Sequence, residues 1–177
     1  MHLAEYDNRP SLEENQGTVT EEDAAFLYGL ALAVRPNLIA EVGTGWFRSL
    51  RAFTEAASWM DRHLGWPCEV WSCDIDQGIC TNAEEEFPSA FIVNGDSAWL
   101  AEKLPTKADL LFIDGEHSYD AVNKDYDNLL PVMSERAVIV FHDTSVNEEV
   151  KKAAIRRGAM ILPAPRGIGL LARGRHV

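Results

Sequence analysis

The sequence is poor in cysteine: it has three in 177 residues, and Cys68, Cys73 and Cys80 form no CxxC pair. This spacing suits neither a disulfide framework nor a zinc finger, so we expect ordinary reduced thiols. The sequence also lacks an apolar run near the ~20 residues that a bilayer-spanning helix needs. Its N-terminal residues lack the basic start and the apolar stretch of a signal peptide. We therefore expect a soluble, cytoplasmic protein.

Basic residues are also scarce: 16 Lys plus Arg stand against 28 Asp plus Glu, which gives a formal net charge of −12. Such a charge repels phosphate backbones and anionic lipids, so nucleic acids and membranes are disfavoured as partners. Hydrophobic residues make up 46% of the chain, which is enough to build a core. The length allows one domain of ordinary size. We predict a flexible N-terminal segment at residues 1–18 and a single domain at residues 19–177.

Short apolar runs alternate with amphipathic segments along most of the chain. The run at 38–42 ends at Gly43-Thr44-Gly45, which is typical of a buried strand followed by a tight turn. Further strands are predicted at 69–74, 90–93, 109–113 and 137–141, and helices at 24–34, 49–64, 79–86, 97–104, 119–130 and 147–157. Thr20-Glu21-Glu22-Asp23 is predicted to cap the first of these helices. This alternation indicates an α/β fold with a doubly wound, mostly parallel sheet that is covered on both faces.

The end of the chain breaks this alternation. Two strand-like runs, 160–162 and 167–172, are separated only by Pro163-Ala164-Pro165-Arg166. Because so short a connection has no room for a crossover helix, the last two strands are predicted to form an antiparallel hairpin at one edge.

Acidic or polar residues follow each predicted parallel strand, at the sheet edge where ligands of such folds bind. They are Glu41, Gly43 and Gly45 around the first strand end, Asp74 and Asp76 after the second, residues 94–97 after the third, residues 114–119 after the fourth and residues 142–144 after the fifth. Helix capping or turn formation explains each of them alone. Their alignment at one edge indicates a binding site.

The first glycine loop discriminates between nucleotide ligands. A dinucleotide fingerprint needs G-x-G-x-x-G, but Arg48 takes the third glycine position, and Asp74 lies 31 positions after Gly43 rather than about 20. A P-loop is excluded because no Gly-Lys-Ser/Thr follows. What remains is a nucleoside without phosphates, approached closely by Gly43 and Gly45 and held through its ribose by an acid. S-adenosylmethionine matches that description.

The same motifs resemble those of class I S-adenosylmethionine-dependent methyltransferases. Glu41-Val-Gly-Thr-Gly45 is similar to their first motif, Asp74 to their ribose-binding acid, and Gly95-Asp96-Ser97 to their adenine-contacting turn. The resemblance spans residues 19–172 and implies a Rossmann-like, seven-stranded sheet of order 3-2-1-4-5-7-6 with an antiparallel last strand. The cofactor contacts that it implies are Glu41, Gly43, Thr44, Gly45, Ser49, Asp74, Ile75, Asp96, Ser97 and Asp114.

A narrower resemblance is carried by residues 111–119, LFIDGEHSY, and by residues 138–144, VIVFHDT. These look like the small O-methyltransferases related to the catechol type, especially those that modify sugars and natural products. The resemblance implies a small-molecule hydroxyl acceptor and a divalent cation such as Mg²⁺ on Asp114 and Asp143. His117, in the loop that the resemblance places beside the acceptor, is the predicted general base. His142 either shares that role or orients Asp143, and Asp114 completes the predicted catalytic set.

Two positions depart from the family pattern and keep alternatives open. Phe47 stands where relatives commonly have Gly, and Thr144 stands where catechol-type enzymes place an Asn metal ligand. The main alternative is a non-catalytic module or partner subunit that binds S-adenosylmethionine without turnover. Nothing names the acceptor atom, so N- or C-methylation and a homodimer that completes the cleft also stay open. The helical pattern favours a core position for Trp99 over stacking on adenine.

Overall fold

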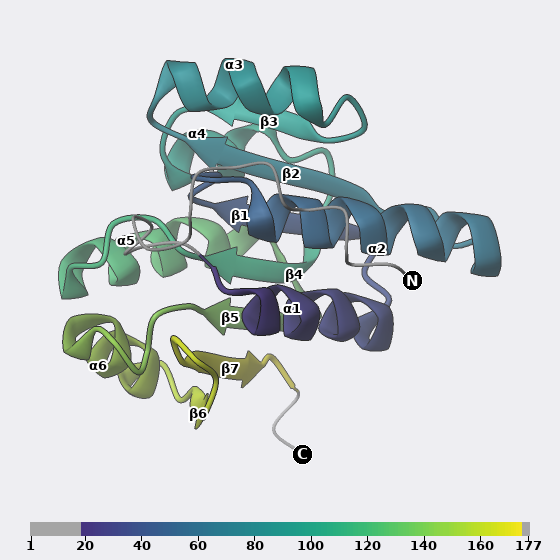
Figure 1. The fold of residues 1–177 in the computed structure, drawn as a ribbon. Coiled ribbons are helices and arrows are strands. Elements are labelled where there is room, and N and C mark those ends of the chain that lie inside the picture. The colour runs from purple at the N-terminus through teal and green to yellow at the C-terminus, as the bar shows by residue number, and fades with distance from the viewer. Residues whose placement is uncertain (1–18, 175–177) are drawn as a thin grey trace.

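The computed structural model describes residues 19–174, which form a seven-stranded sheet of order β3-β2-β1-β4-β5-β7-β6 (Figure 1). The strands are β1 Leu38–Val42, β2 Glu69–Asp74, β3 Phe91–Asn94, β4 Ala108–Ile113, β5 Met133–Phe141, β6 Met160–Leu162 and β7 Ile168–Ala172. Strands β1 to β5 pair in parallel, and β7 runs antiparallel to both β5 and β6. The predicted fold, strand order and terminal hairpin are confirmed. The predicted flexible segment lies outside the described residues.

Helices cover both faces of the sheet. They are α1 Glu21–Val34, α2 Arg48–Leu64, α3 Gln77–Glu86, α4 Ser97–Lys103, α5 Tyr119–Leu129 and α6 Glu148–Arg156, and the short 3-10 helix Leu130–Val132 follows α5. Figure 1 shows α1 and α2 lying together across one face, whereas α5 and α6 lie on the other. Within residues 19–174, no helix is both long and apolar enough to cross a bilayer.

The sheet buries both faces because its strands alternate between two cores. Leu38, Ala40 and Val42 of β1 pack in the core under α4, α5 and α6. Ile39, between them, packs in the core under α1, α2 and α3. Since successive side chains of a strand point to opposite faces, every position of β1 is buried, including Glu41. Because β1 to β5 pair in parallel, their carboxyl ends lie at one edge of the sheet, where the loops that follow them meet.

Two elements begin earlier than the sequence pattern predicts. Strand β5 starts at Met133 rather than at residue 137. The apolar pattern missed this start because polar side chains at 134–136 interrupt the apolar run. Two of these side chains, Ser134 and Arg136, bond to the carboxylate of Asp109 at the start of β4. Helix α1 starts at Glu21 rather than at residue 24, since a capping box extends it by one turn. The other bounds differ only slightly from the prediction.

Candidate active site

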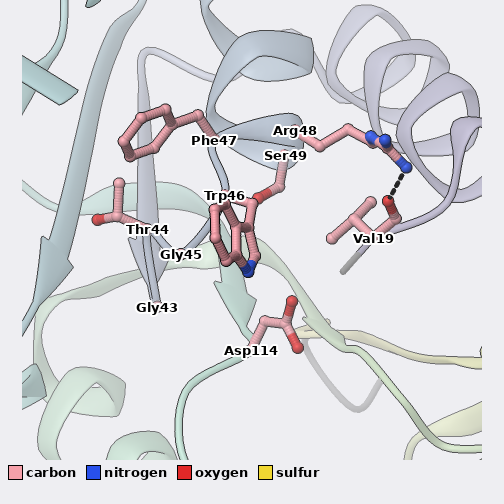
Figure 2. A pocket seen from close by; sticks show the side chains of 9 residues that line it. All are labelled: Val19, Gly43, Thr44, Gly45, Trp46, Phe47, Arg48, Ser49 and Asp114. Carbon is pink, nitrogen blue, oxygen red and sulfur yellow. Dashed lines mark hydrogen bonds between the residues drawn. The ribbon is translucent and has the colours of Figure 1, made fainter. Parts of the chain in front are cut away.

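The loop after β1 borders a cavity of about 60 Å³ at the carboxyl edge of the sheet (Figure 2). The residues that line it come from this loop, from the start of α2 and from two other segments: Val19, Gly43, Thr44, Gly45, Trp46, Phe47, Arg48, Ser49 and Asp114. Pockets that hold a whole small molecule usually measure ~300–1,000 Å³. The cavity therefore fits one part of a ligand, and the rest would lie along the open edge.

Two glycines give this loop its shape. Gly43 has φ +90°, and a Cβ there would meet the backbone oxygen of Asp114 at 2.2 Å. Glycine is thus required where the loops after β1 and β4 touch. Gly45 also has a positive φ, but the space around it is open. Its N–H donates to the Asp74 carboxylate at 3.1 Å, which ties the loop to the end of β2.

Phe47, in the same loop, has a backbone conformation that glycine adopts more easily than other residues. Its φ is +68°, in the left-handed region, where a side chain costs ~1–2 kcal/mol. The ring packs edge-on against Phe87 with 5.9 Å between centroids, and this contact offsets part of the strain. In Figure 2 the ring points away from Asp114. Phe47 therefore forms part of the cavity wall, and its ring packs against Phe87.

Glu41 is a buried acid behind the glycine loop, with no exposed surface. Its Oε2 accepts a hydrogen bond of 2.5 Å from the Ser72 hydroxyl, which is also 2.7 Å from the Thr44 hydroxyl. Burial raises the pKa of Glu41 to about 8. Among the described residues, its other oxygen, Oε1, has no hydrogen-bond partner. A buried polar atom without a partner is rare, and because the raised pKa favours the protonated carboxyl at neutral pH, Glu41 lies behind the loop mainly as a neutral acid.

The acid at the end of β2 keeps acceptor capacity. Asp74 accepts hydrogen bonds from the backbone N–H groups of Gly45 and Asp76, one on each carboxylate oxygen. Each oxygen has a second lone pair, so both can still accept from hydroxyl groups. Ile75, the next residue, exposes 81% of its surface. An acid and an exposed apolar side chain thus lie together at this strand end.

The turn after β3 is built around capping and an aromatic ring. Asp96 caps α4 by accepting from the Trp99 N–H and also bonds Lys124. The Ser97 hydroxyl donates to Asp125 at 2.6 Å, so the side chain that was predicted to bind cofactor is engaged inside the protein. Trp99 is not a core residue: it exposes 45% of its surface, lies against Gly95, and has the Lys103 ammonium 4.4 Å from its ring centroid.

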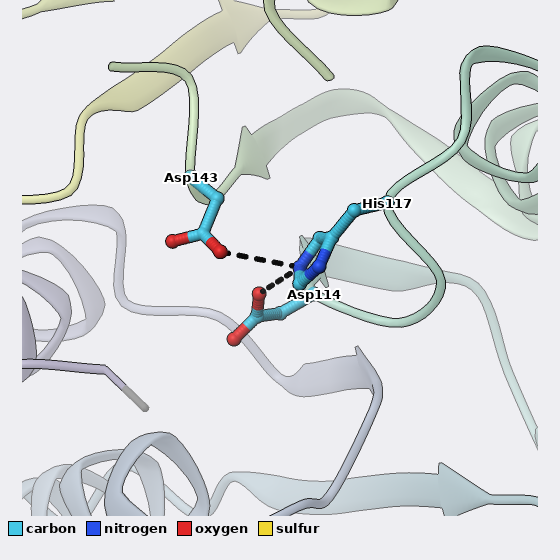
Figure 3. Close-up of side chains that lie close together, drawn as sticks. All are labelled: Asp114, His117 and Asp143. Carbon is cyan, nitrogen blue, oxygen red and sulfur yellow. Dashed lines mark hydrogen bonds and ion pairs between the residues drawn. The ribbon is translucent and has the colours of Figure 1, made fainter. Parts of the chain in front are cut away.

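The loops after β4 and β5 bring together Asp114, His117 and Asp143, as the sequence motifs suggested (Figure 3). The Nε2 atom of His117 lies 3.3 Å from a carboxylate oxygen of each acid. The hydrogen bond that His117 donates to Asp114 raises the pKa of His117, against the effect of burial. The side chain is 35% exposed, so solvent reaches the ring. His117 is therefore an imidazole oriented by carboxylates at an open edge.

His142 lies deeper and is fully buried. Its Nδ1 is 3.1 Å from oxygens of both Asp114 and Asp143, and its Nε2 is 3.3 Å from Asp23 in α1. Burial lowers the pKa of His142, but the hydrogen bonds to Asp114 and Asp23 outweigh it and raise the pKa to about 9. At neutral pH both ring nitrogens are donors, which suits orienting Asp114 and Asp143 better than accepting a proton.

Two residues of the site escaped the sequence reasoning, which placed Asp23 only in a helix cap and Arg166 only in a hairpin turn. Asp23 reaches His142 across 119 positions of sequence. Arg166 makes a bidentate ion pair with Asp143, with Nε 2.6 Å from Oδ1 and a terminal nitrogen 2.9 Å from Oδ2. No local pattern marks either contact, because each depends on how distant elements pack.

The sheet order, the glycine loop after β1 and the acid after β2 define the class of S-adenosylmethionine-dependent methyltransferases. Within that class, the family described as "Methyltransferase domain" matches residues 40–144. The match covers more than half of the chain, and the chain belongs to this family.

Solved methyltransferases share the fold at low sequence identity. The S-adenosylhomocysteine-bound enzyme PaMTH1 from Podospora anserina has a TM-score of 0.72 and 14% identity, over 90% of this chain and 80% of that one. The O-methyltransferase TomG from Streptomyces achromogenes, in complex with S-adenosylmethionine, has a TM-score of 0.70 and 14% identity, over 90% and 83%. The O-methyltransferase from Bacillus cereus, solved with S-adenosylhomocysteine, has a TM-score of 0.70 and 12% identity, over 89% and 83%.

A curated relative, protein y4gI of Sinorhizobium fredii, is 31% identical over 171 residues, which is 84% of this chain. The chain spans only 18% of the length of that relative. The match therefore concerns one part of a longer protein.

The described side chains fit S-adenosylmethionine. The glycine loop and Asp114 border a cavity that fits one part of such a ligand. Asp74 has lone pairs for ribose hydroxyls, and the exposed Ile75 offers an apolar surface for a base. The residue-by-residue contacts stay predictions.

The side chains around Asp114 and Asp143 fit a divalent cation less well. One atom each of Asp114, His117 and Asp143 lies within 4.8 Å of the others, which is a metal-like arrangement. However, both oxygens of Asp143 already face the Arg166 guanidinium, and the buried Thr144 offers only a neutral hydroxyl. Mg²⁺ keeps several waters and binds proteins through one or two carboxylates with free lone pairs, and the guanidinium occupies one lone pair on each oxygen of Asp143 and places a positive charge beside them. These side chains do not fit a hard divalent cation.

Proposed function

We propose that this chain transfers the methyl group of S-adenosylmethionine to a hydroxyl oxygen of a small molecule such as a sugar, a polyol or a phenol. The observation that carries the proposal is the position of Asp114, which lines the cavity of the glycine loop and also holds His117. A proton acceptor thus lies beside the region that fits the methyl donor. The O-methyltransferases that share the fold support the choice of oxygen.

The side chains divide the work of such a transfer. S-adenosylmethionine supplies a methyl group on a sulfonium, and the C–S bond breaks as the C–O bond forms in line. Asp114 and Asp143 hold the Nε2–H of His117, and in the neutral form of the ring the lone pair on Nδ1 takes the hydroxyl proton. The two carboxylates then stabilise the imidazolium. Because the ring is partly exposed, the proton passes on to solvent.

The test is turnover of the full chain on a panel of sugars, polyols and phenols, followed as S-adenosylhomocysteine released and as methylated product by mass spectrometry. His117→Ala should lower turnover at least ~100-fold with little change in affinity for S-adenosylhomocysteine. His63→Ala is the matched control, since His63 is an exposed histidine of α2 that stacks on Trp59. Unchanged turnover in His117→Ala would remove His117 from the reaction, and methylation at nitrogen or carbon would replace the proposed acceptor atom.

The second candidate function is a module that binds the cofactor without turnover, and Phe47 in the glycine position favours it. Thermal unfolding with S-adenosylhomocysteine, beside an NAD control, tests binding first: a ligand at ~100 times its Kd adds about 2.7 kcal/mol to the free energy of unfolding. Binding without turnover on any acceptor would make this the function. No binding up to millimolar concentration would contradict both candidates.

A small-molecule acceptor is also proposed over nucleic acid or membrane, and the formal net charge of −12 supports that choice. A cytoplasmic location and a homodimer stay predictions. Cell fractionation checks the first, and light scattering of the purified chain checks the second.

A further inference from the structure

Asp143 accepts two hydrogen bonds from Arg166, and two imidazole nitrogens lie close to its oxygens. Oδ1 faces Nε of Arg166 at 2.6 Å and Nδ1 of His142 at 3.1 Å. Oδ2 faces a terminal nitrogen of Arg166 at 2.9 Å and Nε2 of His117 at 3.3 Å. A carboxylate has about four lone-pair sites, two on each oxygen. Arg166 therefore occupies one lone pair on each oxygen of Asp143, and two imidazole nitrogens that hydrogen-bond Asp114 crowd the remaining lone pairs.

Backbone hydrogen bonds fix the position from which the Arg166 side chain extends. The Ser145 N–H donates to the Arg166 carbonyl at 2.9 Å, and the Thr144 N–H donates to the Gly167 carbonyl at 3.2 Å. Gly167 has φ +87°, and a Cβ there would meet the Ser145 nitrogen at 2.2 Å. The loop before β7 is thus fastened to the loop after β5, which carries Asp143.

The ion pair also differs from ordinary surface pairs. The Asp143 side chain is 2% exposed and that of Arg166 is 20% exposed, and the contact is bidentate. Exposed ion pairs are weak and mobile, whereas buried, two-pronged guanidinium–carboxylate pairs fix both partners. A divalent cation on Asp143 would have to displace this guanidinium or bind against its positive charge.

We propose that the guanidinium of Arg166 takes the place of the divalent cation at Asp143, so that the site works with a cation built into the chain. This inference deepens the proposed function and rests on it for its meaning in catalysis. The guanidinium keeps Asp143 fixed against His117 and His142, occupies one lone pair on each oxygen, and counters the negative charge that Mg²⁺ would need. The chain therefore has no divalent-cation site at Asp114 and Asp143 while Arg166 is present.

The test is binding of Mn²⁺ to the full chain, measured by the loss of the free-ion electron paramagnetic resonance signal and checked by competition with Mg²⁺. We expect no saturable site in the wild-type chain. Arg166→Gln should open one site and bind Mn²⁺ at least ~100-fold more tightly than the wild type. Arg166→Ser is the second variant, since both changes keep the carbonyl that accepts from Ser145.

Arg157→Gln is the matched control. Arg157 also makes a bidentate pair, with Asp127, whose side chain is 60% exposed, and its loss removes the same charge at a different place. It should leave Mn²⁺ binding at the wild-type level. Adding Asp143→Asn to Arg166→Gln should abolish the new site.

Saturable, Mg²⁺-competed binding of Mn²⁺ to the wild-type chain that Asp143→Asn removes would overturn the proposal. So would folded Arg166→Gln and Arg166→Ser chains that bind no more Mn²⁺ than Arg157→Gln. Because metal binding is read without turnover, failure of methyl transfer on the acceptor panel leaves this result standing. Loss of turnover in EDTA, with an acceptor in hand, would count against the proposal independently.

Discussion

The two halves of the sheet edge hold their carboxylates in different ways. In the cofactor half, the loops after β1, β2 and β3, Asp74 and Asp96 accept from backbone N–H groups of neighbouring segments. In the acceptor half, the loops after β4 and β5, Asp114 and Asp143 face histidines and a guanidinium from distant parts of the chain. Both halves contain acids at strand ends, but in the cofactor half the cation is the exposed Lys124 on Asp96, whereas in the acceptor half imidazoles and a guanidinium surround the buried Asp114 and Asp143.

This difference indicates different kinds of ligand. The groups that bond Asp74 are neutral backbone N–H groups, and each carboxylate oxygen can accept a further hydrogen bond from a hydroxyl group. In the acceptor half the negative charge is already countered, and the acids mainly orient imidazole rings. The first half therefore keeps lone pairs free for a ligand, and the second holds the His117 and His142 rings in fixed orientations, which is the arrangement that the proposed function uses.

The largest effect is expected where the acceptor half depends on a buried charge. Asp23→Ala removes one carboxylate from the fully buried His142 and should lower the free energy of unfolding by ~3–5 kcal/mol, as for other broken buried pairs. Urea unfolding measures this loss. Glu22→Ala, an exposed acid of the same helical turn, should change stability by ~0.5 kcal/mol or less. Equal effects of the two changes would contradict the role of Asp23.

The same cluster should make stability depend on pH. The pKa of His142 is raised from 6.5 to about 9 in the folded chain. Its contribution is therefore fully present below pH 6.5 and is lost as the pH rises through about 9, with a total of about 3 kcal/mol. Urea unfolding from pH 6 to 10 measures the loss. Asp23→Ala should weaken this dependence, and a slope that stays the same in that variant would be evidence against the pairing.

A smaller effect is expected in the cofactor half. Asp74→Asn keeps the shape of the side chain but removes its charge, and hydrogen bonds to charged groups contribute ~1.5–3 kcal/mol. S-adenosylhomocysteine should bind about 10-fold more weakly or worse, as measured by calorimetry. Asp76→Asn is the control, because Asp76 caps α3 through Gly78. Equal losses in the two variants would argue against a specific contact at Asp74.

The smallest effect is expected at Phe47. Phe47→Gly relieves ~1–2 kcal/mol of left-handed backbone strain but loses the contact with Phe87 and gains flexibility in the unfolded chain. These effects nearly cancel, so the free energy of unfolding should change by about 1 kcal/mol or less, and affinity for S-adenosylhomocysteine should stay within ~3-fold. A large gain in affinity would show that Phe47 obstructs the cofactor half.

The cofactor half could be predicted from sequence because its parts are local. The glycine loop, Asp74 and the turn at 95–97 each follow a strand directly, and strand ends are visible in the apolar pattern. The sequence did not reveal that the Ser97 hydroxyl bonds to Asp125, because Asp125 lies in a distant segment. Trp99 fits a helical core pattern and is nevertheless exposed.

The acceptor half was predicted only in part. Asp114, His117 and Asp143 belong to recognisable segments, and the structure brings them together. Asp23 and Arg166 have no such signal, because their partners are 119 and 23 positions away in sequence. Their roles follow from the docking of α1 and from the path of the chain into β7. The start of β5 was missed for a related reason, since its polar residues pair with Asp109 rather than facing a core.

Strand β7 is the last strand in sequence, yet it lies inside the sheet, between β5 and β6. During synthesis, β5 therefore keeps an unpaired edge until residues 168–172 have left the ribosome, while β6 has no partner to pair with. Unpaired edges of apolar strands invite association with other chains. Until β7 inserts, the nascent chain is therefore prone to association through this edge. The same insertion brings Arg166 to Asp143.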